Sequence, residues 1–359
     1  MSLPKQQKAV VVEKYGSGLT LKEVPVPQAG PGQVLVKVDA SVMGSLKSRV
    51  EAPRNPYFSI PEPFVAGTAG VGRVVESDTF KKGQLVYLDP AVWSRDGPEH
   101  YLVKSVGDGA TPESKALSAE EYKRNGYLLQ YALVDIESCY PVNEDAISFD
   151  TDLIAGLTFP LVAYGGFREI GLKPGDTVAI GPSTGRFSSG AVSVAASMGA
   201  KVLALGRDKA TLEKLASHYS NVQPVLLTGD KEADAATLQK LGPLDAYMDY
   251  TPSGAAGPVY LDAAIGALRF GGRVILSGFV FATLSIPYGL VVAKDLTIKG
   301  KFMYSRQEAK DFLKMVENGI FKMDHVSVRK YPIDQYAEAA DVANGKAPWD
   351  ELVVVNNNK

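Results

Sequence analysis

The segment from Thr177 to Lys209 constrains the fold of this chain more than any other stretch. It reads TVAIGPSTGRFSSGAVSVAASMGAKVLALGRDK. The apolar run from Val178 to Ile180 predicts a strand, and a turn rich in glycine and serine follows it. A helix then runs to Met198, and a second strand covers Lys201 to Leu205. This strand–turn–helix–strand order predicts a βαβ unit, in which the two strands are parallel.

The turn of this unit has the composition of a phosphate-binding loop. Small residues allow backbone N–H groups to approach a pyrophosphate, and the following helix N-terminus favours negative charge. Ser183, Gly185 and Ser188 occupy the three positions of the G-x-G-x-x-G pattern. The alternative is an ordinary glycine-rich turn that binds nothing. The residues predicted to contact a nucleotide cofactor here are Ser183, Thr184, Gly185, Arg186 and Phe187.

The end of the second strand bears on which dinucleotide is bound. NAD-binding folds usually carry an acidic residue there, about 20 residues after the turn, to hold the ribose 2′-hydroxyl. Gly206 occupies that position and Arg207 follows it. A guanidinium pairs well with a 2′-phosphate, and Lys209 adds charge, so the sequence favours NADPH over NADH. Two alternatives remain: a shift of one residue makes Asp208 the ribose ligand, or Arg207 and Lys209 are a solvated helix start.

Strands and helices continue to alternate beyond this point. Strands are predicted at 224–227, 244–249 and 273–277, with a helix at 256–268 between the last two. Such alternation predicts a doubly wound parallel sheet, and ligands bind at the carboxyl ends of its strands. Those ends lie near Ser183, Arg207, Thr251 and Gly278.

Composition excludes several classes of function. The chain has 359 residues, enough for two domains, and its hydrophobic and charged fractions of 45% and 22% are ordinary for a soluble globular protein. A net charge of −2 gives no electrostatic case for binding nucleic acid or a membrane surface. No apolar run has transmembrane length, and the first residues lack the apolar core of a signal peptide. The single cysteine, Cys139, indicates a reducing compartment, and we expect a cytoplasmic protein.

The N-terminal part, residues 1–150, has a different sequence pattern from the segment just described. Short strands are predicted at 8–14, 33–41, 71–77 and 84–88, separated by turns with proline and glycine. This pattern predicts a partly open β-barrel. Segment 92–126 is polar and irregular, and we expect it to form a lobe or a lid.

Several motifs, in order along the chain, resemble the medium-chain dehydrogenase/reductase superfamily, the group of zinc alcohol dehydrogenases and quinone reductases. They are LKEVPVPQAGPGQVLVKVDAS, PFVAGTAGVGRVVE, FKKGQLVYL, LVAYGGFREIGLKPGDTVAI, FGGRVILSGF and LTIKGKFMYSR. The resemblance implies an α/β protein with a GroES-like β-barrel substrate domain and a Rossmann doubly wound cofactor domain. The substrate domain is expected at 1–150 and 303–359, and the cofactor domain at 151–302.

The resemblance also implies roles for particular residues. Thr251, Gly278, Phe279 and Met303 match positions that flank the nicotinamide in relatives. Segment 279–287 resembles the edge strand through which relatives pair their cofactor domains. We therefore expect a homodimer.

Zinc-binding members of the superfamily carry ligands that this chain lacks. The positions of the three catalytic zinc ligands fall on Met43, Thr68 and near Thr158. Zinc needs thiolate, imidazole or carboxylate ligands, which these residues do not supply. Segment 92–126 also lacks the cysteines of a structural zinc lobe. The sequence therefore predicts an enzyme that works without zinc.

Without zinc, a hydrogen-bond donor or general acid must steady the charge that develops during hydride transfer. Ser45, Lys47 and Tyr57 are the catalytic candidates, because they fall in segments that resemble the substrate cleft of relatives. Each has a plainer alternative as a helix cap, a solvated cation or a packed aromatic residue. Water as the proton source is a further alternative.

We expect a zinc-independent, NADPH-dependent oxidoreductase that transfers hydride to an activated C=C bond of a small apolar enone, enoyl compound or quinone. Loss of zinc removes the Lewis acid most useful for simple alcohol oxidation. The first alternative is a carbonyl or imine reductase or an alcohol dehydrogenase. The alternative from another class is a non-enzymatic nucleotide-binding sensor or structural protein.

Overall fold

The computed structural model describes residues 3–44, 50–51, 59–95, 100–109, 111–252, 255, 259–278, 280, 283–345 and 347–358. Its contacts divide the chain into two compact units. The first unit combines Met1–Thr158 with Val316–Lys359, and the second is Phe159–Met315. Residues 303–315 thus pack with the second unit. The second unit is thus one continuous segment, inserted between the two segments that form the first unit.

The first unit is built on β-sheets. Its larger sheet has the strand order β10-β6-β5-β3-β18-β17, and β9 also pairs with β3. A smaller sheet has the order β2-β1-β4, and β7 pairs with β8. The strands are β1 (Gln6–Val12), β2 (Thr20–Pro25), β3 (Gln33–Val42), β4 (Phe64–Val65), β5 (Gly70–Ser77), β6 (Leu85–Leu88), β7 (Ala91–Trp93), β8 (Tyr101–Val103), β9 (Tyr131–Asp135), β10 (Cys139–Pro141), β17 (Ser327–Tyr331) and β18 (Glu351–Asn356).

Short helices cover this β structure. Segment 92–126, predicted to be irregular, holds β8 and two helices within its described residues, so that prediction is wrong there. A side-chain cap explains one start: Thr111 accepts a hydrogen bond from the N–H of Ser114 at 3.1 Å, in the manner of N-caps. The helices are α2 (Pro112–Ala119), α3 (Glu121–Arg124) and α11 (Tyr336–Ala343), with 3₁₀ turns at Ile136–Ser138, Glu144–Ala146, Thr151–Leu157 and Ile333–Gln335.

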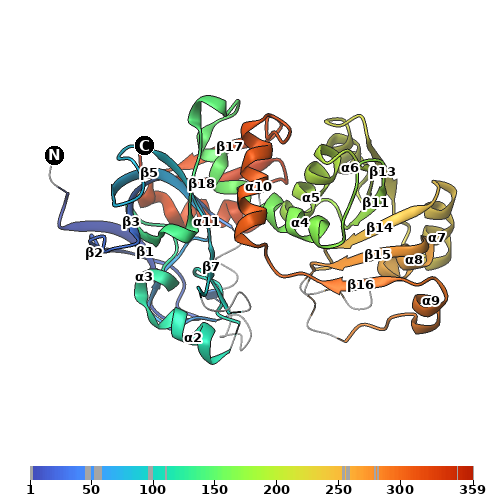
Figure 1. The fold of residues 1–359 in the computed structure, drawn as a ribbon, viewed down its shortest axis with the longest axis horizontal. Helices are drawn as coiled ribbons and strands as arrows, with labels where there is room; N and C mark the ends of the chain where they lie inside the picture. Colours follow the sequence, from blue (N-terminus) through green and yellow to red (C-terminus); the bar gives the residue numbers. More distant parts are fainter. Residues whose placement is uncertain are drawn as a thin grey trace. The chain divides into compact units, whose positions relative to one another are not determined.

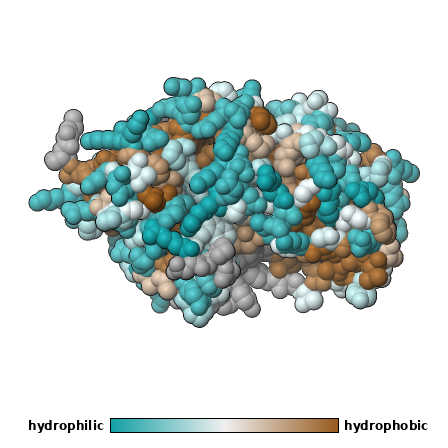
Figure 2. Space-filling view, in the orientation of Figure 1, coloured by the Kyte–Doolittle hydropathy of each residue, from teal (hydrophilic) through white to brown (hydrophobic). Residues whose placement is uncertain are grey.

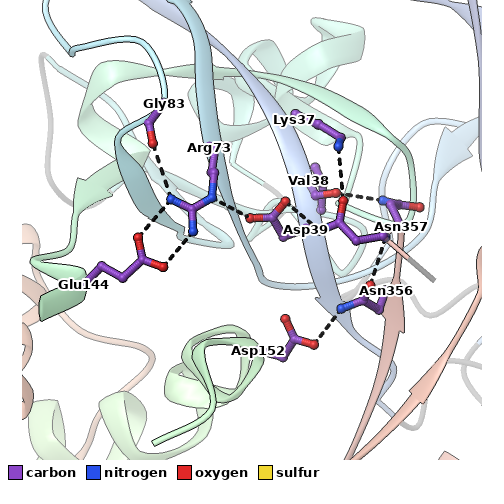
Figure 3. A network of polar contacts seen from close by, with 10 residues as sticks. Lys37, Val38, Asp39, Arg73, Gly83, Glu144, Asp152, Asn356 and Asn357 are labelled. Atoms are coloured by element: carbon purple, nitrogen blue, oxygen red, sulfur yellow. Dashed lines mark hydrogen bonds and ion pairs between the residues drawn. The ribbon is translucent and has the colours of Figure 1, made fainter. Parts of the chain in front are cut away.

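Polar side chains hold the C-terminal strand in place. Arg73 on β5 makes a bidentate ion pair with Glu144, at 2.7 and 2.9 Å, and lies 3.6 Å from Asp39 (Figure 3). Asn356 donates to Asp152 at 2.6 Å, and Asn357 donates to the carbonyl of Val38 at 3.0 Å. Side chains therefore tie the C-terminal segment to β3 through Asn357 and to the 3₁₀ turn at Thr151–Leu157 through Asn356, in addition to the backbone pairing of β18 with β3.

The second unit contains a parallel sheet with the order β13-β12-β11-β14-β15-β16. The chain runs outward from β11 through β12 and β13, then crosses to the other side of β11 for the rest. Figure 1 shows β14, β15 and β16 side by side, from yellow to orange. The strands are β11 (Thr177–Gly181), β12 (Lys201–Gly206), β13 (Val222–Leu226), β14 (Leu244–Asp249), β15 (Leu268–Leu276) and β16 (Thr297–Gly300).

Helices pack on both faces of this sheet. Leu261, Ala264 and Ile265 of α8 join a buried cluster with Tyr247 of β14. On the other face, α4 comes so close that a Cβ on Gly166 would lie 2.7 Å from Met248. The helices are α4 (Thr158–Glu169), α5 (Arg186–Ser197), α6 (Lys209–Ala216), α7 (Lys231–Lys240), α8 (Val259–Ala267), α9 (Tyr288–Ala293) and α10 (Arg306–Glu317).

The α/β class and the doubly wound parallel sheet are confirmed by this arrangement. The expected edge strand at 279–287 is wrong for the residues that the structure describes there, since 280 and 283–287 belong to no strand. Pro287 cannot donate a ladder hydrogen bond. At this end of the described sheet, beyond β15, the edge strand is β16. In the described part of the chain, no helix combines the length and the apolar character needed to span a membrane.

Candidate functional site

The point where the strand order reverses, between β11 and β14, is where doubly wound sheets bind ligands. Ser183 lies in the turn after β11 and is fully buried. Its N–H donates to the carbonyl of Leu205 on β12 at 2.8 Å, and its hydroxyl donates to the carbonyl of Ile180 at 2.7 Å. Ser183 therefore shapes the turn, and its hydroxyl faces the protein.

Helix α5 begins directly after this turn. Gly185 precedes the helix and is exposed, and Thr184 before it is half-buried. The hydroxyl of Ser188 accepts a hydrogen bond from the N–H of Gly185 at 3.0 Å. N–H groups in the first turn of a helix have no acceptor within the helix, and they attract anions. The helix start thus offers backbone donors beside an exposed glycine.

An aromatic and cationic cluster stands at the same helix start. The guanidinium carbon of Arg186 lies 5.7 Å from the ring centroid of Phe159 on α4. The ring of Phe187 meets Phe159 edge-on, with centroids 4.9 Å apart, and 43% of Phe187 is exposed. A cation at a helix N-terminus opposes the helix dipole. An anion bound at this helix start would interact favourably with both the dipole and the Arg186 guanidinium, so Arg186 suits a site for phosphate.

The end of β12 separates the two alternatives for the ribose. Gly206 ends the strand and is buried, while Arg207 is exposed. Asp208 begins α6, where its carboxylate accepts a hydrogen bond from the N–H of Thr211 at 3.1 Å. That hydrogen bond holds the pKa of Asp208 below its usual value. The acidic side chain here serves as a helix cap.

Lys209 has a different environment from Arg207. It lies in the first turn of α6, with 73% of its side chain exposed, and its Nζ lies 3.7 Å from Glu213. An exposed pair of this spacing contributes little to stability. Lys209 therefore adds long-range charge near Arg207 and has an acidic neighbour of its own.

A buried carboxylate lies at the end of β14. Asp249 accepts hydrogen bonds from the hydroxyl of Thr251 at 2.6 Å, from its N–H at 3.1 Å, and from the hydroxyl of Tyr247 at 3.2 Å. Burial raises the pKa of Asp249, and these hydrogen bonds oppose the shift. Tyr260 on α8 in turn donates to the Thr251 hydroxyl at 3.1 Å. Thr251 is thereby fixed at the reversal point of the sheet.

Thr251 was predicted from the sequence, whereas Asp249, Tyr247 and Tyr260 were not. An available signal was the polar run Asp249-Tyr250-Thr251 that ends an apolar strand. Tyr260 is also close enough to Arg207 for the guanidinium charge to lower the pKa of the phenol, against the larger rise caused by burial.

Gly278 explains how the ends of β14 and β15 approach each other. A Cβ at this position would lie 2.5 Å from the carbonyl oxygen of Thr251, 2.6 Å from its nitrogen and 2.7 Å from Asp249 Oδ2. No other residue fits there without moving backbone. Met303 lies beyond β16, is buried and has a φ of 55°, and its carbonyl packs against Gly165 of α4.

The structure thus places most of the predicted cofactor residues at or near the carboxyl edge of one sheet. Phe279, among the predicted cofactor residues, and the catalytic candidates Ser45, Lys47 and Tyr57 lie outside the described residues. The exposed backbone at Gly185 and the close approach at Gly278 fit an extended ligand lying across the edge. A dinucleotide has that shape, with anionic phosphates at its centre, so the donors present fit such a cofactor.

The three positions that match zinc ligands lie in the first unit. Met43 is fully buried in an apolar cluster, Thr158 is buried, and Thr68 is half-buried. Within the described ranges, no three or more His, Cys, Asp or Glu residues form a group that can hold a metal ion. Burial raises the pKa of the single thiol, Cys139, so the neutral thiol is favoured there.

Comparison with known proteins adds family information. The model of a family described as zinc-binding dehydrogenase matches residues 188–318. Alcohol dehydrogenase 1 of Emericella nidulans is 29% identical over 342 residues, covering 90% of this chain and 91% of that protein. Acryloyl-coenzyme A reductase of Metallosphaera sedula is 27% identical over 321 residues, covering 87% and 89%. The relatives thus include both alcohol and enoyl chemistry.

Solved structures share the whole fold. A Sinorhizobium meliloti 1021 protein whose crystal structure has NADP bound aligns over 98% of this chain and 100% of its own, with a TM-score of 0.75 and 19% identity. At that identity the likeness concerns the fold alone. The chain is thus similar to zinc-binding dehydrogenases over residues 188–318, and to alcohol dehydrogenases and acryloyl-coenzyme A reductases over most of its length.

Proposed function

We propose that this protein is a zinc-independent, NADPH-dependent reductase that transfers hydride to an activated C=C bond of a small apolar enone, enoyl compound or quinone. The observation that carries the cofactor choice is at the end of β12. Gly206 stands where an acidic ribose ligand is usual, Arg207 is exposed beside it, and Asp208 is engaged as a helix cap. A guanidinium in that place suits a 2′-phosphate.

The bound nicotinamide supplies the hydride, and the protein supplies position and electrostatics. In the proposal, the exposed Gly185 lets the pyrophosphate approach the N–H groups of Arg186 and Phe187 in the first turn of α5, and the side chains of these two residues lie beside it. Arg207 and Lys209 hold the 2′-phosphate. Thr251, Gly278, Phe279 and Met303 flank the nicotinamide, while Ser183 and Thr184 form the turn. The reduced substrate takes its proton from Ser45, Lys47 or Tyr57, or from water.

Zinc independence rests on the sequence. Met43, Thr68 and Thr158 stand at the matching ligand positions, and none is a competent zinc ligand. The match to the zinc-binding dehydrogenase family covers 188–318, which does not include them. Acryloyl-coenzyme A reductase among the relatives favours C=C reduction. The alcohol dehydrogenases among them favour the second candidate, carbonyl reduction or alcohol oxidation.

The proposal includes a homodimer formed through the cofactor domain. Phe270, Ile286, Tyr288 and Val292 are between 46% and 81% exposed, although all are large and apolar. Figure 2 shows apolar surface gathered over the region of β15, β16 and α9. A patch of this kind favours a contact with a second copy. Sedimentation of the purified protein tests it: a dimer is expected, dissociated by Val292→Glu, and a monomer at high concentration rejects it. We place the protein in the cytoplasm.

Titration with NADPH and NADH tests the cofactor assignment. The unmodified protein is expected to bind NADPH more tightly, and Arg207→Ala to lose most of that preference while binding NADH as before. Loss of a charged hydrogen bond corresponds to roughly a 10- to 100-fold weaker NADPH affinity. Lys214→Ala, at the far end of α6, is the matched control and leaves both affinities unchanged. Equal affinities for both dinucleotides in the unmodified protein reject the assignment. Binding of neither favours the alternative of a non-enzymatic structural protein.

A further inference from the structure

A buried amine in the first unit, that of Lys104, has no part in the proposed cofactor site. Lys104 directly follows β8. Its Nζ donates to the carbonyl of Tyr122 at 2.6 Å and to the carbonyl of Asn125 at 3.2 Å. Lysine is rarely buried without a carboxylate beside it, yet Lys104 makes no ion pair in the part of the chain that the structure describes. Its burial therefore needs an explanation.

The two carbonyls that Lys104 meets belong to the end of α3. Tyr122 lies within this short helix, and Asn125 directly follows it. The last carbonyls of a helix have no N–H partner within the helix, so they accept hydrogen bonds from other groups. A lysine amine has enough N–H groups to serve two carbonyls at once. Lys104 therefore caps the C-terminus of α3 from another part of the chain.

The chain that follows α3 packs tightly against residues 65–67. The N–H of Gly126 donates to the carbonyl of Val65 at 2.7 Å. A Cβ on Gly126 would overlap the carbonyl oxygen of Gly67, so only glycine fits there. Release of the Lys104 cap would thus loosen residues 65–67 as well as α3.

The residue after Lys104 joins the same contact. Ser105 is buried and has a φ of 56°, a region that residues other than glycine seldom adopt. In this conformation its N–H donates to the carbonyl of Arg124 at 2.9 Å, and its hydroxyl donates to the carbonyl of Gly67 at 3.0 Å. Lys104 and Ser105 together fasten the end of α3 to the chain at Gly67.

Burial outweighs the charges around Lys104. It lowers the pKa of the amine from 10.5 to about 7, while Asp135 on β9 raises that pKa and Lys123 on α3 lowers it. The carboxylate of Asp135 is engaged elsewhere, since it accepts a hydrogen bond from the phenol of Tyr122 at 2.9 Å. The other charged neighbours have partners of their own: Glu120 pairs with Lys123 at 2.7 Å, Asp108 accepts from the Ser118 hydroxyl at 2.9 Å, and Arg124 donates to the carbonyl of Ala119 at 2.8 Å.

We propose that Lys104 is a proton-controlled latch: its neutral amine holds α3 and the chain after it against residues 65–67, and gain of a proton favours release of that segment. In the released segment the amine is hydrated and titrates at its ordinary value. Between the two pKa values, release takes up one proton, so the released fraction falls about tenfold for each unit of rising pH. Below about pH 7 both forms carry the proton, and the fraction is constant. The latch does not rest on the proposed function.

Hydrogen exchange of single amides in the unmodified, full-length protein tests the latch, with the N–H groups of Ser105 and Gly126 as reporters. The intrinsic exchange rate of an amide rises with pH, because hydroxide catalyses it. The released fraction is expected to fall by the same factor, so exchange of the reporters should stay nearly level from about pH 7 to about pH 9. The N–H of Leu212 in α6 should exchange faster as the pH rises. Reporters that speed up as strongly as Leu212 overturn the inference.

Urea separates local release from unfolding of the whole unit. Local release exposes little surface, so exchange of the reporters should be insensitive to low concentrations of urea. The N–H of Val38 on β3 donates to the carbonyl of Gln130 at 2.9 Å, inside the larger sheet, and its exchange should respond to urea as global unfolding does. Equal urea dependence for Ser105, Gly126 and Val38 means that Lys104 is exposed only by global unfolding, which overturns the inference.

Lys104→Gln keeps an N–H donor and carries no charge at any pH. Exchange of its reporters should therefore rise with pH, as it does for amides elsewhere. Lys115→Gln, on the exposed side of α2, is the matched control and should keep the level profile of the unmodified protein. A level profile in Lys104→Gln assigns the pH dependence to another group and overturns the inference. If Lys104→Gln does not fold, the pH and urea profiles of the unmodified protein decide by themselves.

Discussion

The carboxylate of Asp208 accepts a hydrogen bond from the backbone N–H of Thr211 at 3.1 Å and so caps helix α6. This contact decides how the end of β12 is interpreted. From the sequence alone, Asp208 was a rival to Arg207 as the residue that meets the adenosine ribose. Its use as a cap leaves Arg207, which is exposed, as the side chain available to a 2′-phosphate.

Replacing Asp208 by Ala separates the two roles. Loss of the cap is expected to give a small fall in Tm, because the first turn of α6 loses an acceptor for its N–H groups. The ratio of NADPH to NADH affinity should stay as it is or rise. Thermal unfolding and titration of the same sample measure both. A large loss of NADH affinity in this variant would instead make Asp208 the ribose ligand.

Gly278→Ala tests the close approach of β14 and β15. The added Cβ would lie 2.5 Å from a backbone oxygen, so strands or loop must move. Overpacking of this kind typically costs about 1–3 kcal/mol, and cofactor affinity should fall too because Thr251 is displaced. Gly289→Ala is the control, since nothing lies within 4 Å of its added Cβ. Urea unfolding that shows equal stability for both variants contradicts the geometry.

Glu169 gives the second unit an acid-sensitive contact. Its carboxylate, at the end of α4, accepts hydrogen bonds from Lys299 and from Lys301, the latter at 2.9 Å. These bonds lower the pKa of Glu169 from 4.5 to about 2. Because the folded pKa is depressed, the stabilisation is complete above pH 4.5 and disappears as the pH falls towards 2.

The corresponding measurement is unfolding of Glu169→Gln against the unmodified protein across this pH range. The unmodified protein is expected to be more stable above pH 4.5, and the difference should shrink steadily towards pH 2. Glu232→Gln, on the exposed side of α7, serves as the control for losing a carboxylate. A stability difference that does not change with pH would show that the lysines do not act through the charge of Glu169.

Lys104 gives the first unit a pH dependence of the same sign in the alkaline range. Its ammonium is buried, donates to the carbonyls of Tyr122 at 2.6 Å and Asn125 at 3.2 Å, and lies 5.4 Å from the ring centroid of Tyr127. Burial lowers its pKa from 10.5 to about 7. Between these values the unfolded chain holds a proton that the folded protein has lost. Stability therefore rises with pH through this window and is insensitive to this group below it.

Lys104→Met removes that titration. The stability of the unmodified protein should increase relative to the variant as the pH is raised from 7 towards 10.5. The variant also leaves two carbonyls without their donor, so it is expected to be less stable throughout. Lys115→Met, on the exposed side of α2, should show no such slope. Parallel pH profiles for Lys104→Met and the unmodified protein would mean that Lys104 stays protonated in the folded protein throughout this pH range, which contradicts the prediction.

The parallel sheet could be predicted from the sequence because its signal is local. Apolar runs of strand length alternate with helices, and the strand 244–249 has the predicted bounds. The turn after β11 was also found, since its small residues are consecutive. Segment 279–287 failed, because resemblance to an edge strand does not decide whether a neighbour is present to pair with it.

The side-chain arrangement of the site was beyond prediction from the sequence. The hydroxyl of Ser183 points back to Ile180, and nothing in the order of residues distinguishes that from a hydroxyl facing a ligand. Likewise, Tyr260 reaches Thr251 only because α8 packs against the sheet. Such contacts join residues far apart in the chain, so they depend on packing more than on local pattern.

The most direct test of the proposed function is NADPH oxidation by protein dialysed against a chelator, with an enoyl thioester or enone as acceptor and the matching saturated ketone in parallel. We expect that the C=C acceptor is reduced, that the saturated ketone is not, and that added zinc changes neither rate. Turnover of the ketone alone, or activity that is lost on chelation and restored by zinc, would contradict it.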